Sequence, residues 1–189
     1  MEEIVKSDLA KKYFPIYKYG YHFRLVGIDD AEFILSLRNN PILSFHLSET
    51  SNQLTDQIDW IQKYKEREKQ GLEFYIICIG TKTNKKLGLN RLYNITSHEF
   101  EIGSWLYEPG LEISTSIIGD IVARSFAFEV LECTSCVFNV RKANKSVLKY
   151  HLSYKPEIVD ENDINFHFRL TEENFTIHKN KLLKILGHD

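Results

Sequence analysis

The stretch HEFEIGSWLYEPGLEISTSIIGDIVARSFAFEVLECTSCVFNVRKANKSVLKYH, residues 98–151, decides the fold. Its hydrophobic periodicity predicts a strand, a short loop, a long helix, a second strand and a second helix, in that order. The alternation along the first strand places Phe100, Ile102, Ser104 and Leu106 on one face and Glu101, Gly103 and Trp105 on the other. We therefore expect the Glu101 carboxylate to lie beside a large aromatic side chain on a half-buried face.

The long helix is predicted to begin at residues 114–116, whose sequence Ser-Thr-Ser is typical of a helix N-terminus. Unpaired amides and the helix dipole make such an N-terminus attractive to anions. After the second strand, residues 134–140, Asn144 can cap the next helix and would share one face of it with Val147 and His151. The stretch is thus predicted to form a βαβα unit with a potential anion site.

Three segments of this unit resemble the GNAT superfamily of N-acetyltransferases: EIGSWL on a strand, SFAFEVL closing a helix, and VRKANKSVLKYH running from a strand into a helix. The branch that the chain resembles most contains ribosomal-protein alanine acetyltransferases and acetyltransferases of nucleotide-linked amino sugars. The resemblance implies an α/β (α+β) fold with a mixed, mostly antiparallel twisted sheet of about six to seven strands flanked by helices. It also implies a splayed V between two central strands, which holds acetyl-CoA.

The length of 189 residues and mass of 22.2 kDa suit one domain, residues 1–189, in which residues 1–13 could form an N-terminal arm. The chain has 43% hydrophobic and 26% charged residues, and no segment approaches the ~20 apolar residues that cross a bilayer. We therefore expect a cytoplasmic protein that does not bind membranes. A net charge of −2 gives no reason to expect nucleic-acid binding.

The closest pair of cysteines, Cys133 and Cys136, lies on a predicted strand. A zinc ribbon would need a second such pair, and a redox motif would be expected at a helix start. We interpret them as buried reduced thiols and expect no metal site.

Elsewhere, aromatic and apolar side chains at every second position of residues 14–26 predict a strand. Helices are predicted from residue 29 to before Pro41 and from 55 to 71, followed by three antiparallel strands at 74–79, 87–95 and 100–107. A last strand is predicted at 164–170 and a C-terminal helix at 171–186.

Two groups are the catalytic candidates that the resemblance implies. Glu101 would orient a water or take a proton from the acceptor amine, although it could instead be a structural carboxylate paired with Arg91 or another strand neighbour. The family usually has a tyrosine seven positions after the motif asparagine, as the proton donor to the CoA sulfur. Here that position holds His151, preceded by Tyr150, and both are candidates for this role. Tyr150 cannot simply substitute in place, because adjacent residues of a helix point about 100° apart. A histidine could donate this proton, although a lone helical histidine is more often structural.

The resemblance also implies residues that contact the cofactor: Trp105, Leu106, Ser114, Thr115, Ser116, Asn139 and Asn144. Family members usually carry a basic, glycine-containing loop around the pyrophosphate. This chain has residues 108–116 there, with Glu108 and Glu112 and no basic residue. Serine and threonine hydroxyls and helix-start amides would then hold the diphosphate.

The acceptor pocket is expected to involve Arg38, Arg91 and Tyr93. Arg38 could meet a phosphate of a nucleotide-linked substrate, or be a solvated arginine at a helix C-terminus.

The first functional hypothesis is an acetyl-CoA-dependent N-acetyltransferase acting on the primary amine of a nucleotide-linked amino sugar, by direct transfer in a ternary complex. The second is an acetyltransferase of protein or peptide N-termini. The third is a degenerate GNAT domain that no longer binds cofactor and serves as a binding module. A small-molecule acceptor is the expected partner, and a homodimer is possible.

Overall fold

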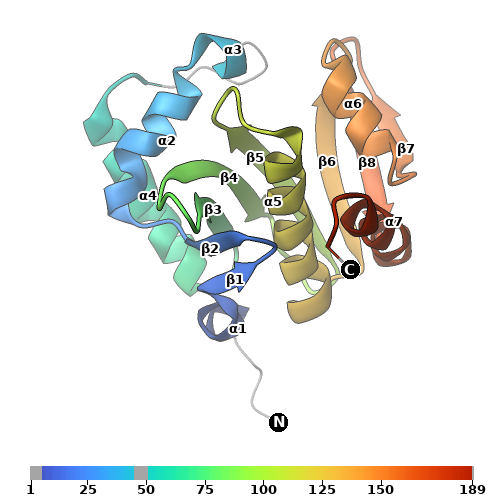
Figure 1. The fold of residues 1–189 in the computed structure, drawn as a ribbon, viewed down its shortest axis with the longest axis horizontal. Coiled ribbons are helices and arrows are strands. Elements are labelled where there is room, and N and C mark those ends of the chain that lie inside the picture. Colours follow the sequence, from blue (N-terminus) through green and yellow to red (C-terminus); the bar gives the residue numbers. More distant parts are fainter. Residues whose placement is uncertain (1–5, 45–50, 189) are drawn as a thin grey trace.

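The computed structural model describes residues 6–44 and 51–188, drawn in colour in Figure 1. The helices are α1 Lys6–Tyr13, α2 Ala31–Arg38, α3 Pro41–Ser44, α4 Leu54–Lys69, α5 Ile113–Ser125, α6 Lys145–Leu152 and α7 Glu172–Ile185. A π-helical turn, Phe126–Val130, extends α5, and a short 3₁₀ helix, Ile28–Asp30, precedes α2. The strands are β1 Ile16–Lys18, β2 Tyr21–Leu25, β3 Phe74–Gly80, β4 Lys86–Tyr93, β5 Glu99–Tyr107, β6 Ser135–Arg141, β7 Glu157–Glu161 and β8 Asn165–Thr171.

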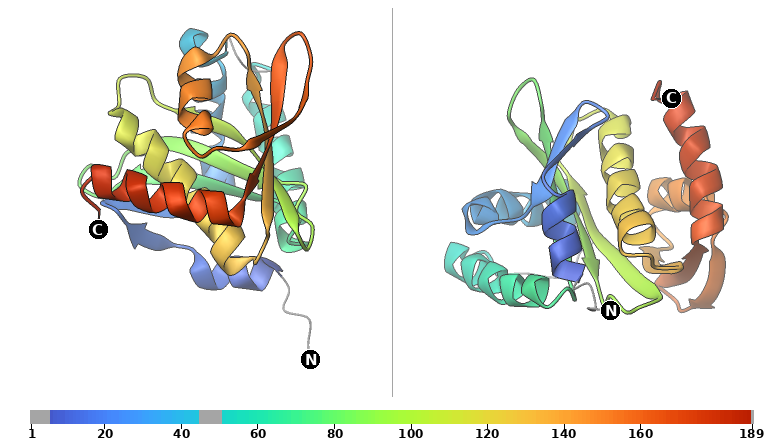
Figure 2. Two further views of the ribbon diagram at one scale, coloured as in Figure 1. Left: turned by 90° about the vertical axis from the view of Figure 1, so that its right-hand side faces the viewer. Right: turned by 90° about the horizontal axis from the view of Figure 1, so that it is seen from below.

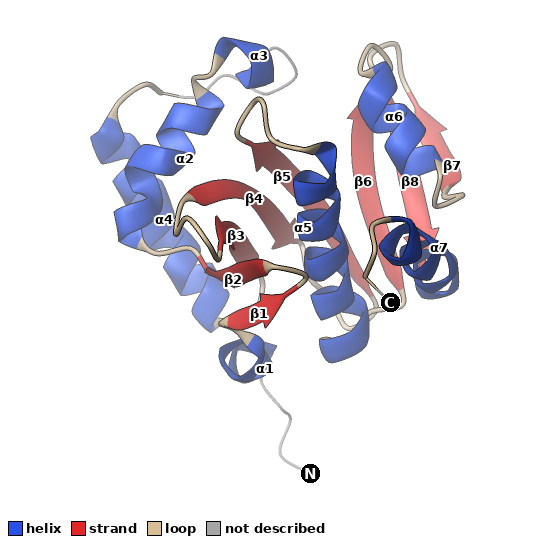
Figure 3. Cartoon of the chain, viewed as in Figure 1, coloured by secondary structure: helices blue, strands red, loops and turns tan. Residues whose placement is uncertain are grey.

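One sheet joins these strands in the order β1-β2-β3-β4-β5-β6-β8-β7 (Figure 3). Each neighbouring pair is antiparallel except β5 and β6, which are parallel. The predicted mixed, mostly antiparallel α/β fold is confirmed. The eight strands within residues 6–44 and 51–188 slightly exceed the predicted number.

One additional strand comes from residues 14–26, for which the prediction of a single strand is wrong. These residues form the β1–β2 hairpin, in which Ile16 pairs with Phe23. Tyr19 and Gly20 turn the chain with φ of 54° and 83°. Because positive φ values suit a tight turn rather than a strand, the regular tyrosine spacing concealed the reversal. The other additional strand, β7, is an exposed edge strand.

Helices cover both faces of the sheet (Figure 2). On one face, α2 and α4 pack their apolar sides on the sheet, as in the cluster of Ile34, Ile61, Ile77, Leu89 and Leu106. On the opposite face, α5 and the π-helical turn that extends it supply Ile118, Ile121 and Phe126 to a larger cluster that includes Phe74 and Phe100. The helical spacing of these buried residues explains why α5 forms where predicted.

A β-bulge in β5 changes which side chains face each layer. Ser104 has φ of 47°, and the pairing with β4 shifts by one residue between Leu89 and Arg91. After the bulge, Trp105 packs on the α5 side and Leu106 on the α2–α4 side. The prediction that Glu101 and Trp105 share a face is therefore wrong, because an inserted residue reverses the alternation.

Strands β5 and β6 separate soon after they meet. Their pairing consists of Glu99 with Ser135, Phe100 with Cys136, and Glu101 with Val137. Beyond these pairs the two strands diverge, with α5 beside the opening (Figure 1). This arrangement confirms the predicted V between two central strands.

The three cysteines, Cys78, Cys133 and Cys136, are free and buried, which confirms the interpretation of reduced thiols. Burial raises the pKa of Cys78 and Cys136 to about 12, so neither is a reactive thiolate at neutral pH. Among the described residues, none of the helices is long and apolar enough to span a bilayer.

Candidate functional site

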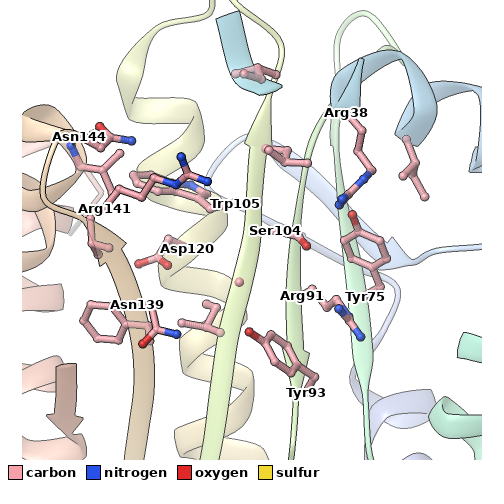
Figure 4. A pocket seen from close by; sticks show the side chains of 18 of the residues that line it. Arg38, Tyr75, Arg91, Tyr93, Ser104, Trp105, Asp120, Asn139, Arg141 and Asn144 are labelled. Carbon is pink, nitrogen blue, oxygen red and sulfur yellow. Dashed lines mark hydrogen bonds between the residues drawn. The ribbon is translucent and has the colours of Figure 1, made fainter. Parts of the chain in front are cut away.

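A cavity of about 1090 Å³ lies where β5 and β6 diverge. Lining residues come from helices α2, α4, α5 and α6 and from strands β3 to β6. Figure 4 labels ten of them. On one side, called here the α2 side, the polar and aromatic lining residues include Arg38, Trp60, Tyr75, Arg91 and Tyr93. On the other, called the α6 side, they include Trp105, Asp120, Asn139, Arg141, Asn144 and His151.

The α2 side is built around an aromatic and cationic cluster. Arg91 Nε donates to Glu73 Oε1 at 2.6 Å, and Arg67 donates to the other oxygen of this buried carboxylate. Both guanidinium groups lie over the ring of Trp60, at 5.0 Å for Arg91 and 5.6 Å for Arg67. Of these two arginines, Arg91 lines the cavity. One carboxylate between two guanidinium groups leaves a net positive charge there, which suits an anion.

Glu101 stands behind Tyr93 rather than in the cavity lining. The Tyr93 hydroxyl donates to Glu101 Oε1 at 2.6 Å, and Asn94 Nδ2 donates to Oε2 at 3.0 Å. Glu101 therefore pairs with its cross-strand neighbour Tyr93, while Arg91 pairs with Glu73. Any action of Glu101 on a molecule in the cavity would pass through Tyr93.

The α6 side rests on a buried polar network between α5 and α6. Arg124, which is fully buried, donates from Nε to both oxygens of Asp120, at 3.1 and 3.0 Å, and from Nη1 to Cys136 Sγ at 3.0 Å. The Tyr150 hydroxyl donates to Asp120 Oδ2 at 2.8 Å and lies 3.0 Å from the Tyr154 hydroxyl. Burial raises the pKa of Tyr150 well above its usual value, so its phenol stays protonated and engaged within the network.

His151 is a buried residue that touches this network and lines the cavity. Its Nδ1 lies 3.5 Å from Arg124 Nη2, and its ring packs on Phe138 at 4.7 Å and Trp105 at 5.4 Å. Arginine is always a donor, so Nδ1 accepts and Nε2 carries the proton. Burial, and then the charge of Arg124, lower the pKa of His151 well below its usual value, which makes it a neutral donor rather than an imidazolium.

The start of α5 uses its hydroxyl groups internally. Thr115 is buried and its Oγ1 lies 2.9 Å from the Tyr21 hydroxyl, while Ser116 Oγ donates to Ile113 O at 3.0 Å. Ser114 Oγ donates to Glu112 Oε2 at 3.3 Å, and Glu112 is the N-cap residue. Among the described residues the three hydroxyl side chains stand outside the cavity lining. The anion-binding groups that this turn offers are therefore its backbone amides, of which Thr115 N already donates to Glu112 O at 3.0 Å.

Neither a protein-family model nor a curated protein sequence matches the chain. Solved structures do. The apo form of FdhC, described as a nucleotide-linked sugar GNAT, is 28% identical, with a TM-score of 0.80 over 89% of this chain and 96% of its own. The ribosomal-protein-S5-alanine acetyltransferase of Vibrio fischeri is 16% identical, with a TM-score of 0.73 over 85% and 97% of the two chains.

A third match is the N-acetyltransferase PseH of Campylobacter jejuni in complex with acetyl coenzyme A, 20% identical, with a TM-score of 0.59 over 79% of this chain and 99% of its own. The chain has the GNAT fold. The predicted resemblance, drawn from residues 98–151, is thereby confirmed. The resemblance implied two strands that pair and then diverge, with a helix after the first of them. In this structure they are β5, β6 and α5.

The GNAT cavity gathers many of the predicted site residues. Those that line it are Arg38, Arg91, Tyr93, Trp105, Leu106, Asn139, Asn144 and His151. Asn144 also caps α6, because its Oδ1 accepts from Val147 N at 3.3 Å. Glu101, Tyr150 and residues 114–116 stand behind or beside the lining instead. Their roles stay predictions, as do those of the residues in the cavity.

Sequence reasoning missed several residues around this cavity. Trp60 and Tyr75 come from α4 and β3, far from the segment that carried the resemblance. Asp120 and Arg124 offered a signal, since opposite charges four residues apart inside an otherwise apolar helix indicate a buried pair. Arg141 lay within the quoted segment, at the end of the strand that borders the opening.

The neutral state of His151 predicts a pH dependence of stability. In the unfolded chain this histidine takes a proton below about pH 6.5, whereas in the folded protein its lowered pKa keeps it neutral. The unfolded state then binds more protons, so stability falls as pH drops below about 6.5, by up to about 1.4 kcal/mol per pH unit from this group. Above that pH the group contributes no further change.

We expect His151→Gln to reduce the decrease in the free energy of unfolding between about pH 7.5 and about pH 5.5. Urea unfolding of the variant and of the unaltered protein, at about pH 7.5 and about pH 5.5, measures the loss of stability on acidification. A variant that loses as much stability on acidification as the unaltered protein would show that His151 titrates normally in the folded state.

Proposed function

We propose that this protein is an acetyl-CoA-dependent N-acetyltransferase that transfers an acetyl group to the primary amine of a nucleotide-linked amino sugar, in a ternary complex. The observation that carries the proposal is the continuity of the cavity. It joins the opening between β5 and β6 to a cationic, aromatic wall on the α2 side. A donor thioester entering through the opening would thus meet an acceptor bound on the α2 side.

The opening suits acetyl-CoA. Past Glu101 and Val137 the facing edges of β5 and β6 are not paired with each other, so they can offer backbone amides and carbonyls to an extended amide-containing arm. The start of α5 supplies amides and the positive end of a helix dipole for the diphosphate. Glu112 opposes this attraction, whereas Arg141, the last residue of β6 and part of the cavity lining, supports it. PseH, a neighbour in fold, was solved in complex with acetyl coenzyme A, which supports the proposed donor.

The α2 side suits an acceptor that carries phosphate and an aromatic base. Arg38 and Arg91 point into the cavity close to Tyr75 and Tyr93 (Figure 4), and Trp60 lies under Arg91. Guanidinium groups bind phosphate, and aromatic rings stack on nucleobases. A wall with these charges disfavours polyamines and basic peptides, because like charges in a low-dielectric cleft repel. The 28% identity to the nucleotide-linked sugar GNAT points the same way.

His151 has a defined task in this reaction. Its Nδ1 accepts from Arg124, so its Nε2–H is the group left to donate to the thioester oxygen or the departing sulfur. Tyr150 cannot take this task in the observed arrangement, because its hydroxyl is engaged by Asp120 and Tyr154.

Two arginines with a shared partner test the acceptor site. Arg91→Met is expected to raise the acceptor KM by about ten- to a hundredfold, since it removes a charged contact worth about 1.5–3 kcal/mol. Arg67→Met is the matched control, because Arg67 also bonds Glu73 and stacks on Trp60 without lining the cavity. Steady-state kinetics with a varied nucleotide sugar measures both. Equal effects of the two substitutions would place the acceptor elsewhere.

An acetyl-transfer assay tests the function itself. The purified protein is mixed with acetyl-CoA and with nucleotide-linked 3-amino and 4-amino deoxysugars, peptides with free N-termini, or spermidine, and released thiol is followed. We expect release with at least one nucleotide sugar and none with spermidine. Turnover of peptides alone would favour the N-terminal acetyltransferase, and no turnover with any amine would contradict the proposed activity.

A further inference from the structure

Tyr93 occupies the point at which the sheet opens. It is the last residue of β4 and pairs with Glu101 of β5, whose partner on the other side, Val137, ends the pairing with β6. Tyr93 lines the cavity and Glu101 does not. Figure 4 shows Tyr93 from β4 and Asn139 from β6 reaching into the cavity from opposite sides.

The phenol ring is held in this position from both sides. A Cβ atom on Gly103 would lie 3.2 Å from Tyr93 Oη and 3.1 Å from Cε1, so glycine is what allows the ring to lie against β5. On its other side, the guanidinium of Arg91, which also belongs to β4, lies 4.6 Å from the centroid of the Tyr93 ring. The hydroxyl is therefore fixed at the opening of the V rather than free to rotate into solvent.

The hydrogen bonds of Glu101 set the direction of the Tyr93 proton. The Tyr93 hydroxyl donates to Glu101 Oε1 at 2.6 Å, and Asn94 Nδ2 donates to Glu101 Oε2 at 3.0 Å. With its proton committed to Glu101, the phenolic oxygen has lone pairs left to accept an N–H from a molecule in the cavity.

The phenol cannot be a base by itself. Burial, and then the bond to Glu101, raise the pKa of Tyr93 far above its usual value, so it remains protonated. The charged or titratable groups facing it are Arg91 on β4, Glu101 on β5 and Cys136 on β6. Of these, the carboxylate is the group that can receive a proton through the short bond. A proton arriving at Tyr93 must therefore be matched by one leaving to Glu101.

We propose that Tyr93 is a catalytic residue that relays a proton from the acceptor amine to Glu101, an inference that rests on the proposed acetyl transfer. As the amine nitrogen bonds to the thioester carbon, one N–H proton moves to Tyr93 Oη and the phenolic proton moves to Glu101 Oε1. The C–S bond breaks, its electron pair leaves with sulfur, and the thiolate takes a proton from solvent. Glu101 then returns its proton to solvent, which restores both side chains.

Tyr93→Phe and Glu101→Gln, singly and together, test the relay. Each single change should lower kcat by about a hundredfold, within the range of general base catalysis, with the acceptor KM changed by less than about threefold. Because the two groups act in series, the double variant should be no slower than either single one, instead of about ten thousandfold slower. Tyr17→Phe, the same change at an exposed tyrosine on β1, is the control and should match the unaltered protein.

A proton inventory in mixed H₂O and D₂O adds a readout that packing would not affect. We expect two protons in flight in the unaltered protein and fewer in Tyr93→Phe, with thermal unfolding midpoints showing that each variant is folded. Normal kcat in Tyr93→Phe, a change confined to KM, or multiplicative losses in the double variant would overturn the relay while leaving acetyl transfer intact. Failure of the unaltered protein to acetylate any amine would overturn both.

Discussion

Asp120→Asn is expected to lower the free energy of unfolding by about 3–5 kcal/mol. Asp120 and Arg124 are 1% and 0% exposed, and the carboxylate accepts from Arg124 and from Tyr150. Removing its charge leaves a guanidinium in the core with the neutral acceptors Cys136 and His151. A buried charge without its counter-ion costs far more than an exposed one, because water cannot solvate it.

Urea unfolding of Asp120→Asn beside Asp8→Asn measures this difference. Asp8 pairs with Lys11 at 2.9 Å, but both side chains are more than half exposed, at 55% and 69%. We expect no measurable shift in the unfolding midpoint for Asp8→Asn, since exposed ion pairs contribute little. Equal midpoints for the two variants would mean that the network between α5 and α6 does not support the fold.

Gly119→Ala is expected to cost about 3 kcal/mol, at the upper end of overpacking. Its Cβ would lie 1.6 Å from Tyr107 Oη and 2.6 Å from Cζ, so tyrosine and alanine cannot occupy these positions together. Tyr107 cannot easily withdraw, because its hydroxyl donates to Asn90 at 2.8 Å and its ring is also packed against Gly88. The clash would push α5 away from the sheet.

Two further variants distinguish a clash from a general effect of losing glycine. Gly27→Ala should be close to neutral, since nothing lies within 4 Å of its added Cβ. Tyr107→Phe combined with Gly119→Ala should be less destabilised than the sum of the single changes, because the nearest clashing atom is gone. Thermal or urea unfolding measures the three single variants Gly119→Ala, Gly27→Ala and Tyr107→Phe, the double variant and the unaltered protein. Strict additivity of the Tyr107→Phe and Gly119→Ala effects would contradict the proposed contact.

The fold was predictable where the hydrophobic pattern is long and regular. Residues 98–151 carry both periods, two for the strands and 3.6 for α5, and periodicity therefore located the βαβα unit, whereas the resemblance implied the V. The hairpin turns at two positive φ values, of which Gly20 offered a signal and Tyr19 did not, and the bulge depends on a positive φ at Ser104, a residue type that rarely adopts one. The bulge mattered most, since it moved Trp105 to the α5 side.

The site was predictable by position more than by role. Periodicity and resemblance located Arg91, Tyr93 and His151, which line the cavity. The hydrogen-bond partners of these residues could not be predicted from the sequence, because they depend on which side chains tertiary packing brings together. Glu101 meets Tyr93 across a strand pair, and His151 meets Arg124 from another helix, at sequence separations of 8 and 27.

The most direct measurement of the central claim is a calorimetric titration of the purified protein with acetyl-CoA, with desulfo-CoA and free nucleotide sugars as separate titrants. We predict saturable binding of acetyl-CoA at micromolar concentrations, because the open V and the start of α5 can replace a basic glycine loop. Desulfo-CoA should bind as well, since it keeps the diphosphate and the amide arm. No binding of acetyl-CoA, with nucleotide sugars present or absent, would contradict the account and favour a GNAT domain that serves only as a binding module.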